Sequence, residues 1–460
     1  MKVTTEDLRR HYASMPDAEL FAVNRDDLTD LARPCYDAEV ERRGLTGISP
    51  QSGHEGEAVP VAIFANANSA ALARSVLQSA GIECYLENEH ATQWTAGPEG
   101  VPLMVAAEDL KQARALLAQD DEAAAPADPW DGTIMHQFAE TNGIRMHYAE
   151  AGNGPLVILC HGFPESWYSW RHQLPALASE EYHVVAPDLR GYGQTDRPEA
   201  VEAYDILQLV GDLVGLVNAL NEGPAVVVGH DWGAMLASHA ALLRPDLFRA
   251  VALLSVPYVP RRTVNQSQWE AQKYAGKIFY QAVLRSPGAE PFFESDIRAR
   301  LLSGLWALSG DAPPHLRWQP ARDPDAPPIP PAVPASLPPW LTGQDLDFLE
   351  GEYQRTGFTG GLNYYRNCDR NWELTPFLDG ARLQQFTLFL AGEKDPVLDF
   401  LREEFDALQD NVPDLWKKVL LPGAGHWIQQ ERPEQVNQLL IAFLKSLEAS
   451  TSQFAPSATE

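Results

Sequence analysis

The sequence has few cysteines, few basic residues and no long apolar run. Its four cysteines lie far apart and form no CxxC pair, so we expect neither a disulfide framework nor a zinc site. Lysine and arginine number 35 against 63 aspartates and glutamates, and the net charge of -28 argues against binding to nucleic acid or to anionic membranes. No apolar segment reaches the roughly 18 residues of a membrane span, and the charged first residues do not resemble a secretory signal. We therefore expect a cytoplasmic protein without a metal centre.

The first 132 of the 460 residues differ in character from the rest. Residues 1–58 carry scattered leucines among charges and predict a short helical preface. Short strands and helices alternate over residues 59–119, for which we expect a small α+β module of ferredoxin-like type with a regulatory role. Residues 120–132 are rich in Asp, Glu, Ala and Pro without periodicity and predict a linker.

From residue 133 onward, apolar strands alternate with amphipathic helices, which predicts an α/β fold with a parallel sheet covered on both faces. The expected strands are residues 156–160, 183–187, 225–228, 250–255, 386–391 and 418–421. The fourth and fifth strands are separated by a segment that contains eleven prolines between Pro313 and Pro339 and is too long for a loop. We therefore expect a core of residues 133–257 and 376–449, an inserted lid domain at 258–375, and a tail at 450–460.

The sharpest local signal is the run Gly-His-Asp-Trp-Gly at residues 229–233, between a predicted strand and a predicted helix. This pattern is typical of a nucleophile elbow, in which glycines permit a strained turn that presents one side chain, here Asp231. A carboxylate that attacks a saturated carbon forms an ester, which water can cleave, whereas a serine would form a stable ether. An aspartate nucleophile therefore predicts an epoxide or an alkyl halide as substrate. The alternative is that Asp231 caps the following helix.

Two possible partners follow later strands in the order nucleophile, acid, histidine that this arrangement requires. Asp395 follows the strand at 386–391, and His426 follows the strand at 418–421. His426 would be the general base for water, and Asp395 would fix its tautomer and stabilise the imidazolium. The alternatives are an aspartate in a surface turn and a hydrogen-bonded loop histidine.

Backbone donors and aromatic side chains complete the predicted site. The ester intermediate needs N–H groups directed at its oxyanion, and the amides of Phe163 and Trp232 are the natural pair. Trp167 and Trp232 are expected to line an apolar substrate pocket. His161 is expected to be structural, and His230 should point away from the site if Asp231 points into it.

The segment from about residue 135 to 447 resembles the soluble epoxide hydrolases of the α/β-hydrolase superfamily, most specifically through the lid run at residues 357–367. The resemblance implies that Tyr365 of this run pairs with a second lid tyrosine, Tyr280. The chemistry agrees, because an alkoxide leaves poorly unless it is protonated, and a phenol with a pKa of about 10 is neutral at pH 7 and can donate. A halide needs no such proton.

The amino-terminal part departs from the mammalian enzyme, whose additional domain is a phosphatase, because no Asp-x-Asp motif precedes residue 120. Residues 59–119 resemble instead small bacterial domains to which signal transduction is ascribed, with residues 84–89 as the most telling run. We expect this module to bind an unidentified protein or to self-associate.

The combined prediction is a cofactor-independent bacterial epoxide hydrolase that converts small apolar epoxides to vicinal diols, with a role in detoxification. Two alternatives stay open at this point. A haloalkane dehalogenase shares the aspartate elbow and tryptophan-rich surroundings, and a ligand-binding regulatory protein could reuse the hydrolase shell.

Overall fold

The computed structural model describes residues 133–325 and 333–452, the segments 32–42, 58–64, 84–86, 101–106 and 109–113, and the single positions 5, 9, 12, 15, 29, 74, 77 and 82. The chain divides into two compact units, Met1–Ala127 and Asp128–Glu460. The predicted linker at 120–132 lies outside the described residues. Of the predicted tail at 450–460, residues 450–452 are the end of the last helix, α20 (Pro433–Ser452), and the rest lies outside the described residues. None of the described helices combines the length and the apolar character needed to cross a membrane.

The smaller unit contains a three-stranded antiparallel sheet. Its described elements are α3 (Arg33–Arg42), β1 (Ala58–Phe64), β2 (Cys84–Leu86) and β3 (Val101–Ala106). The strand order is β1-β3-β2, and β3 runs antiparallel to both neighbours. Buried apolar side chains of these strands pack with Leu77, Ile82 and Ala113. This order is that of a split β-α-β unit; the ferredoxin-like fold and the regulatory role stay predictions.

The larger unit is built on one eight-stranded sheet of order β13-β12-β9-β8-β6-β7-β5-β4. The strands are β4 (Met135–Thr141), β5 (Ile144–Ala151), β6 (Leu156–Cys160), β7 (His183–Pro187), β8 (Ala225–His230), β9 (Phe248–Leu254), β12 (Phe386–Gly392) and β13 (Leu415–Leu421). Strands β6 to β9, β12 and β13 are parallel, whereas β4 and β5 form an antiparallel hairpin at one edge. The predicted α/β class is confirmed, and the hairpin is an element that the sequence pattern did not reveal.

The central strands are buried on both faces, which explains their nearly continuous apolar sequences. All residues of β6 and β8 are buried. Alternate residues of each strand enter different cores, so that Ile158 and Val227 belong to one cluster and Val157 and Val226 to the other.

Helices cover both faces of this sheet. Those outside the insertion are η2 (Trp167–Trp170), α6 (Gln173–Ala178), η3 (Val201–Tyr204), α7 (Ile206–Leu220), α8 (Trp232–Leu243), α16 (Pro396–Phe400), α17 (Arg402–Asp406), α18 (Leu408–Asn411), α19 (Ile428–Glu431) and α20 (Pro433–Ser452). The start of α7 is fixed by Asp205, whose carboxylate accepts from the amides of Leu207 and Gln208.

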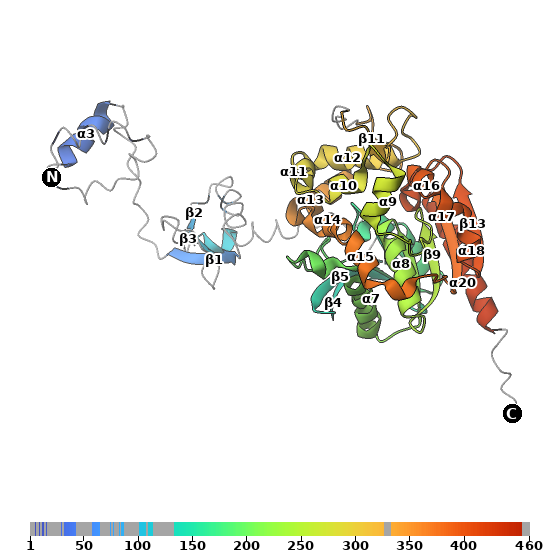
Figure 1. Cartoon of the computed structure of the whole chain (residues 1–460). Helices are drawn as coiled ribbons and strands as arrows, with labels where there is room; N and C mark the ends of the chain where they lie inside the picture. Colours follow the sequence, from blue (N-terminus) through green and yellow to red (C-terminus); the bar gives the residue numbers. More distant parts are fainter. Residues whose placement is uncertain are drawn as a thin grey trace. The chain divides into compact units, whose positions relative to one another are not determined.

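The insertion between β9 and β12 is mostly helical. It contains α9 (Gln266–Lys273), β10 (Ile278–Phe279), α10 (Tyr280–Leu284), α11 (Ala289–Glu294), α12 (Ile297–Leu308), β11 (Ala321–Arg322), α13 (Gly343–Thr356), α14 (Thr359–Arg366), α15 (Cys368–Leu374) and η4 (Pro376–Leu378). A capping box of Thr342 and Asp345 begins α13. In Figure 1 the yellow and orange helices α10 to α13 gather at one end of the larger unit, away from α7 and β4. We call this insertion the lid.

Candidate active site

The turn between β8 and α8 holds Asp231 in a strained backbone conformation. Its φ of 54° and ψ of -118° lie in a region that costs a non-glycine residue of order 1–3 kcal/mol. The turn depends on close packing at two glycines. A Cβ at Gly229 would lie 2.0 Å from the carbonyl oxygen of Gly233, and a Cβ at Gly233 would lie 2.0 Å from that of Cys160. The predicted elbow is therefore present, with Asp231 at its apex.

The carboxylate of Asp231 meets a backbone donor from the neighbouring loop. Oδ1 accepts a hydrogen bond of 3.0 Å from the amide of Phe163. This approach requires glycine at position 162, because a Cβ there would lie 2.4 Å from the Cβ of Asp231. The Asp231 side chain is 17% exposed, so it stays accessible to a ligand. The amide of Trp232, the other predicted donor, begins α8 directly after Asp231, and its role stays a prediction.

The predicted histidine and acid lie next to this carboxylate. His426 Nδ1 donates to Asp395 at 3.0 and 3.1 Å from the two carboxylate oxygens, and Asp395 is itself held by the amide of Val397. His426 Nε2 lies 3.6 Å from Asp231 Oδ2, beyond an ordinary hydrogen bond. Burial on its own lowers the pKa of His426, but Asp395 and Asp231 outweigh it and raise the pKa to about 10. The resting imidazole is therefore a cation between two carboxylates.

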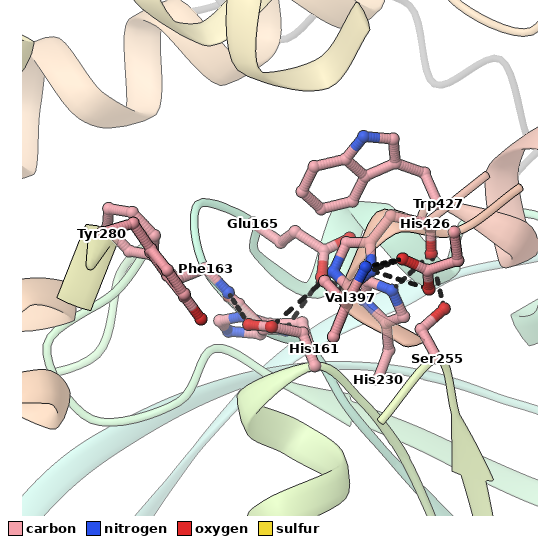
Figure 2. A network of polar contacts seen from close by, with 12 residues as sticks. His161, Phe163, Glu165, His230, Ser255, Tyr280, Val397, His426 and Trp427 are labelled. Carbon is pink, nitrogen blue, oxygen red and sulfur yellow. Dashed lines mark hydrogen bonds and ion pairs between the residues drawn. The ribbon is translucent and has the colours of Figure 1, made fainter. Parts of the chain in front are cut away.

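A second buried histidine supports the loop that carries His426. The ring nitrogens of His230 lie 2.7 Å from a carboxylate oxygen of Glu165 and 2.8 Å from the backbone carbonyl of His426. Ser255 donates to the same carbonyl at 2.7 Å. Figure 2 shows this network, and in that view the amide of Phe163 lies between Tyr280 and His426. Both ring nitrogens of His230 are occupied, so it cannot serve as the base for water. His161 is likewise structural, because its Nε2 accepts from the amide of Leu189.

The two lid tyrosines reach a cavity of about 100 Å³ that is also lined by Asp231. The rings of Tyr280 and Tyr365 are 6.3 Å apart between centroids. The rest of the lining is mostly apolar and includes Trp232, Met235, Val256, Val259, Trp269, Phe400 and Leu401. Burial, followed by the charge of Asp231, raises the pKa of both phenols. Both tyrosines are therefore neutral donors at physiological pH.

One predicted site residue lies elsewhere. Trp167 is not among the residues that line this cavity; it packs against His136, Tyr168 and Phe348 in the core on the other face of the sheet. The prediction that it contacts substrate is wrong for this cavity, because an aromatic residue near the oxyanion loop can turn to either side. Trp232 does line the cavity, as expected.

Three polar residues of the site were not assigned from the sequence. Glu165 and Ser255 fix His230 and the His426 loop, and Gln281 donates to the phenol oxygen of Tyr280 at 3.0 Å. Each follows a motif that the sequence did reveal, or a strand end in the case of Ser255. Their positions next to these motifs were the available signal, but the partners of Glu165 and Ser255 come from distant segments of the chain.

Two family models match the chain. The alpha/beta hydrolase fold matches residues 155–433, and a family described as "Putative prokaryotic signal transducing protein" matches residues 61–120. The first match spans the described site, and the second falls within the smaller unit.

Known proteins are similar to about two thirds of this chain. Epoxide hydrolase A of Mycobacterium tuberculosis is 46% identical over 324 residues, which cover 69% of this chain and 99% of that protein. Epoxide hydrolase 3 of Siraitia grosvenorii is 41% identical, with 68% of this chain and 98% of that protein covered. The solved structure of an epoxide hydrolase from an endophytic Streptomyces is 43% identical, with a TM-score of 0.66 and coverage of 69% and 97%.

Proposed function

Because this chain belongs to the epoxide hydrolases of the alpha/beta hydrolase fold family, we propose that it converts epoxides to vicinal diols through a covalent ester on Asp231. Family membership establishes the class of reaction. The residues that carry it, and the order of the steps, are inferred from the geometry of the site.

In the first step Asp231 Oδ2 attacks one ring carbon while Oδ1 keeps its hydrogen bond to the amide of Phe163. The carbon–oxygen bond of the ring breaks, and its electron pair goes to the epoxide oxygen. Tyr280 and Tyr365 both line this cavity and donate hydrogen bonds to that oxygen. One of them transfers its proton to the oxygen and is left as a phenolate. The product is a hydroxyalkyl ester of Asp231.

The second step hydrolyses this ester. Esterification removes the negative charge of Asp231, which is one of the two charges that keep His426 protonated. His426 can then lose its proton, which passes through solvent to the phenolate and restores the neutral phenol. The neutral imidazole takes a proton from water while Asp395 holds the ring through Nδ1. The hydroxide attacks the ester carbonyl carbon, and the Phe163 amide stabilises the oxyanion on Oδ1. The bond between the carbonyl carbon and Oδ2 then breaks, and the hydroxyl proton brought by the hydroxide passes to the departing oxygen. Release of the diol leaves the carboxylate of Asp231.

The observation that carries this proposal is the position of two neutral phenols in the cavity of an aspartate nucleophile. Haloalkane dehalogenation remains the second candidate, because it uses the same nucleophile and Trp232 and Trp269 also line the cavity. A departing halide needs no proton, however, so two phenols are better suited to an epoxide oxygen.

A panel of epoxides and chloroalkanes tests the proposal. Wild-type protein should form diols from aromatic and terminal epoxides and release no halide from chloroalkanes. The Asp231→Ala variant should lose activity by roughly 10⁴-fold or more, since loss of a nucleophile removes the covalent route. Halide release without diol formation would favour the dehalogenase, and diol formation by Asp231→Ala would refute the role of Asp231.

A further inference from the structure

Behind Tyr280 the lid contains a continuous chain of hydrogen-bonded side chains. Arg262 Nη1 donates to Gln266 Oε1 at 3.0 Å, Gln266 Nε2 donates to Gln281 Oε1 at 3.0 Å, and Gln281 Nε2 donates to Tyr280 Oη at 3.0 Å. All four residues line the cavity that contains Asp231. The chain therefore links a fixed cation to one of the two phenols.

The direction of this chain is set by groups that cannot reverse their roles. Arg262 can only donate, and the Glu270 carboxylate, which accepts from Gln266 Nε2 at 3.0 Å, can only accept. Glu270 is buried, and Arg285 holds both of its oxygens. The amide of Gln266 is therefore fixed with its oxygen toward Arg262 and its nitrogen toward Glu270 and Gln281.

The fixed orientation of the Gln266 amide determines the orientation of the Gln281 amide. Since Gln266 presents N–H to Gln281, the oxygen of Gln281 must face it, and the nitrogen of Gln281 must face Tyr280. The phenol oxygen of Tyr280 thus accepts from Gln281. The hydroxyl hydrogen of Tyr280 is therefore not directed at Gln281. It can donate to an acceptor that enters the cavity lined by Tyr280 and Asp231.

We propose that Gln281 is a positioning residue that, through this chain from Arg262, reserves the hydroxyl hydrogen of Tyr280 for the epoxide oxygen. The inference rests on the proposed function and adds a residue to it. Hydrogen bonds aligned in one direction also polarise one another, so the chain makes Tyr280 a better donor as charge develops on the epoxide oxygen. Tyr365 lies outside the chain and should not depend on it.

Single-turnover kinetics with styrene oxide test this role in the full-length protein. Ester formation is followed by tryptophan fluorescence, and diol release is followed by quenching and chromatography. Gln281→Met keeps the length of the side chain but removes the donor, and should slow ester formation roughly tenfold, the weight of one hydrogen bond to a charged transition state. Ester hydrolysis should not change, because that step does not use Tyr280. Equal slowing of both steps would contradict the proposal.

Two further variants separate positioning from packing. In Gln281→Glu the carboxylate can only accept, so it should capture the Tyr280 hydrogen and slow ester formation more than Gln281→Met does. Gln354→Met, on the exposed face of α13 and bonded to Glu350, is the matched control and should react as wild type. A Gln281→Glu variant faster than Gln281→Met would overturn the fixed direction of the chain.

Double mutants show whether the effect of Gln281→Met acts through Tyr280. Gln281→Met should have no further effect in a Tyr280→Phe background and should keep its full effect in a Tyr365→Phe background. An equal effect in both backgrounds would overturn the inference. If wild-type protein forms diol and Gln281→Met forms the ester at the wild-type rate, only this inference fails. If wild-type protein forms no diol at all, the proposed function fails and the inference falls with it.

Discussion

At the scale of single residues, the site combines groups whose protonation states differ because of their surroundings. Two carboxylates keep His426 protonated, whereas burial and the charge of Asp231 keep Tyr280 and Tyr365 neutral. A single charged group, Asp231, therefore acts on all three partners. In the proposed mechanism, esterification of Asp231 would change the environment of all three groups at once.

The phenols should contribute unequally to different substrates. Tyr280→Phe and Tyr365→Phe should each slow epoxide opening, and the double variant should lose most of the roughly 10²–10⁴-fold contribution of general acid catalysis. The loss should be smallest for epoxides with electron-withdrawing substituents, whose oxygen leaves more easily. Steady-state rates over a series of substituted styrene oxides measure this. A double variant with normal rates would remove both tyrosines from the mechanism.

The titration of His426 should depend on Asp231. In Asp231→Ala the pKa of His426 should fall below its wild-type value of about 10, because one of the two charges that raise it is gone. Since the folded-state pKa lies above the unfolded value of about 6.5, this group stabilises the wild-type fold fully below pH 6.5 and loses that contribution as the pH rises to 10. NMR titration of labelled histidines, with denaturation at several pH values, checks both statements. An unchanged His426 pKa in the variant would contradict them.

Chemical reasoning from the sequence selected Asp231, Asp395 and His426 because each lies just beyond the carboxyl end of a strand, where parallel strands bring loop residues to one edge. It failed for Trp167, because the direction of an aromatic ring depends on packing with Phe348 from the lid, far away in the sequence. It also missed Gln281, whose role depends on contacts with Gln266 and Tyr280 rather than on any local pattern.

At the scale of elements, the elbow between β8 and α8 sets the position of Asp231. The tight approach of β8, α8 and the loop after β6 leaves no room for side chains at the flanking glycines. The central strands β6 and β7 begin and end where the apolar runs predicted. The β4–β5 hairpin escaped prediction because most of β4 is exposed and its pattern is weak.

A pair of glycine substitutions tests the elbow. Gly233→Ala places a Cβ 2.0 Å from the carbonyl oxygen of Cys160, so α8 must shift and Asp231 with it, and activity should fall by at least about tenfold. Gly351→Ala is the matched control, since a Cβ there meets nothing within 4 Å and alanine favours a helix by about 1 kcal/mol. Thermal denaturation and kcat/KM should separate the two variants. A fully active Gly233→Ala would show that the elbow tolerates displacement.

At the scale of the whole molecule, the residues proposed for catalysis all belong to the unit Asp128–Glu460. Epoxide hydrolase A of Mycobacterium tuberculosis and the Streptomyces enzyme are covered almost completely by about two thirds of this chain, and the hydrolase family model matches residues within the larger unit. The sequence predicted this division, because the periodic apolar pattern is interrupted by a stretch rich in Asp, Glu, Ala and Pro at residues 120–132. The sequence did not indicate a ligand for the smaller unit, because the interpretation of that unit depended on a resemblance to a family whose description names no ligand.

A fragment that begins at residue 128 should therefore keep kcat/KM within about twofold of the full chain, since domains with their own core can fold alone. Diol formation by equal concentrations of fragment and full chain measures this. A folded fragment, judged by circular dichroism, with much lower activity would show that the smaller unit takes part in catalysis or its regulation.

The covalent ester on Asp231 is tested most directly by a single turnover in water enriched in ¹⁸O, with enzyme in excess over epoxide. The water oxygen should enter the Asp231 carboxylate, because hydrolysis occurs at the ester carbonyl carbon, and mass spectrometry should find the label in the peptide that carries Asp231. Label found only in the diol, with none in that peptide, would mean that water attacks the epoxide directly.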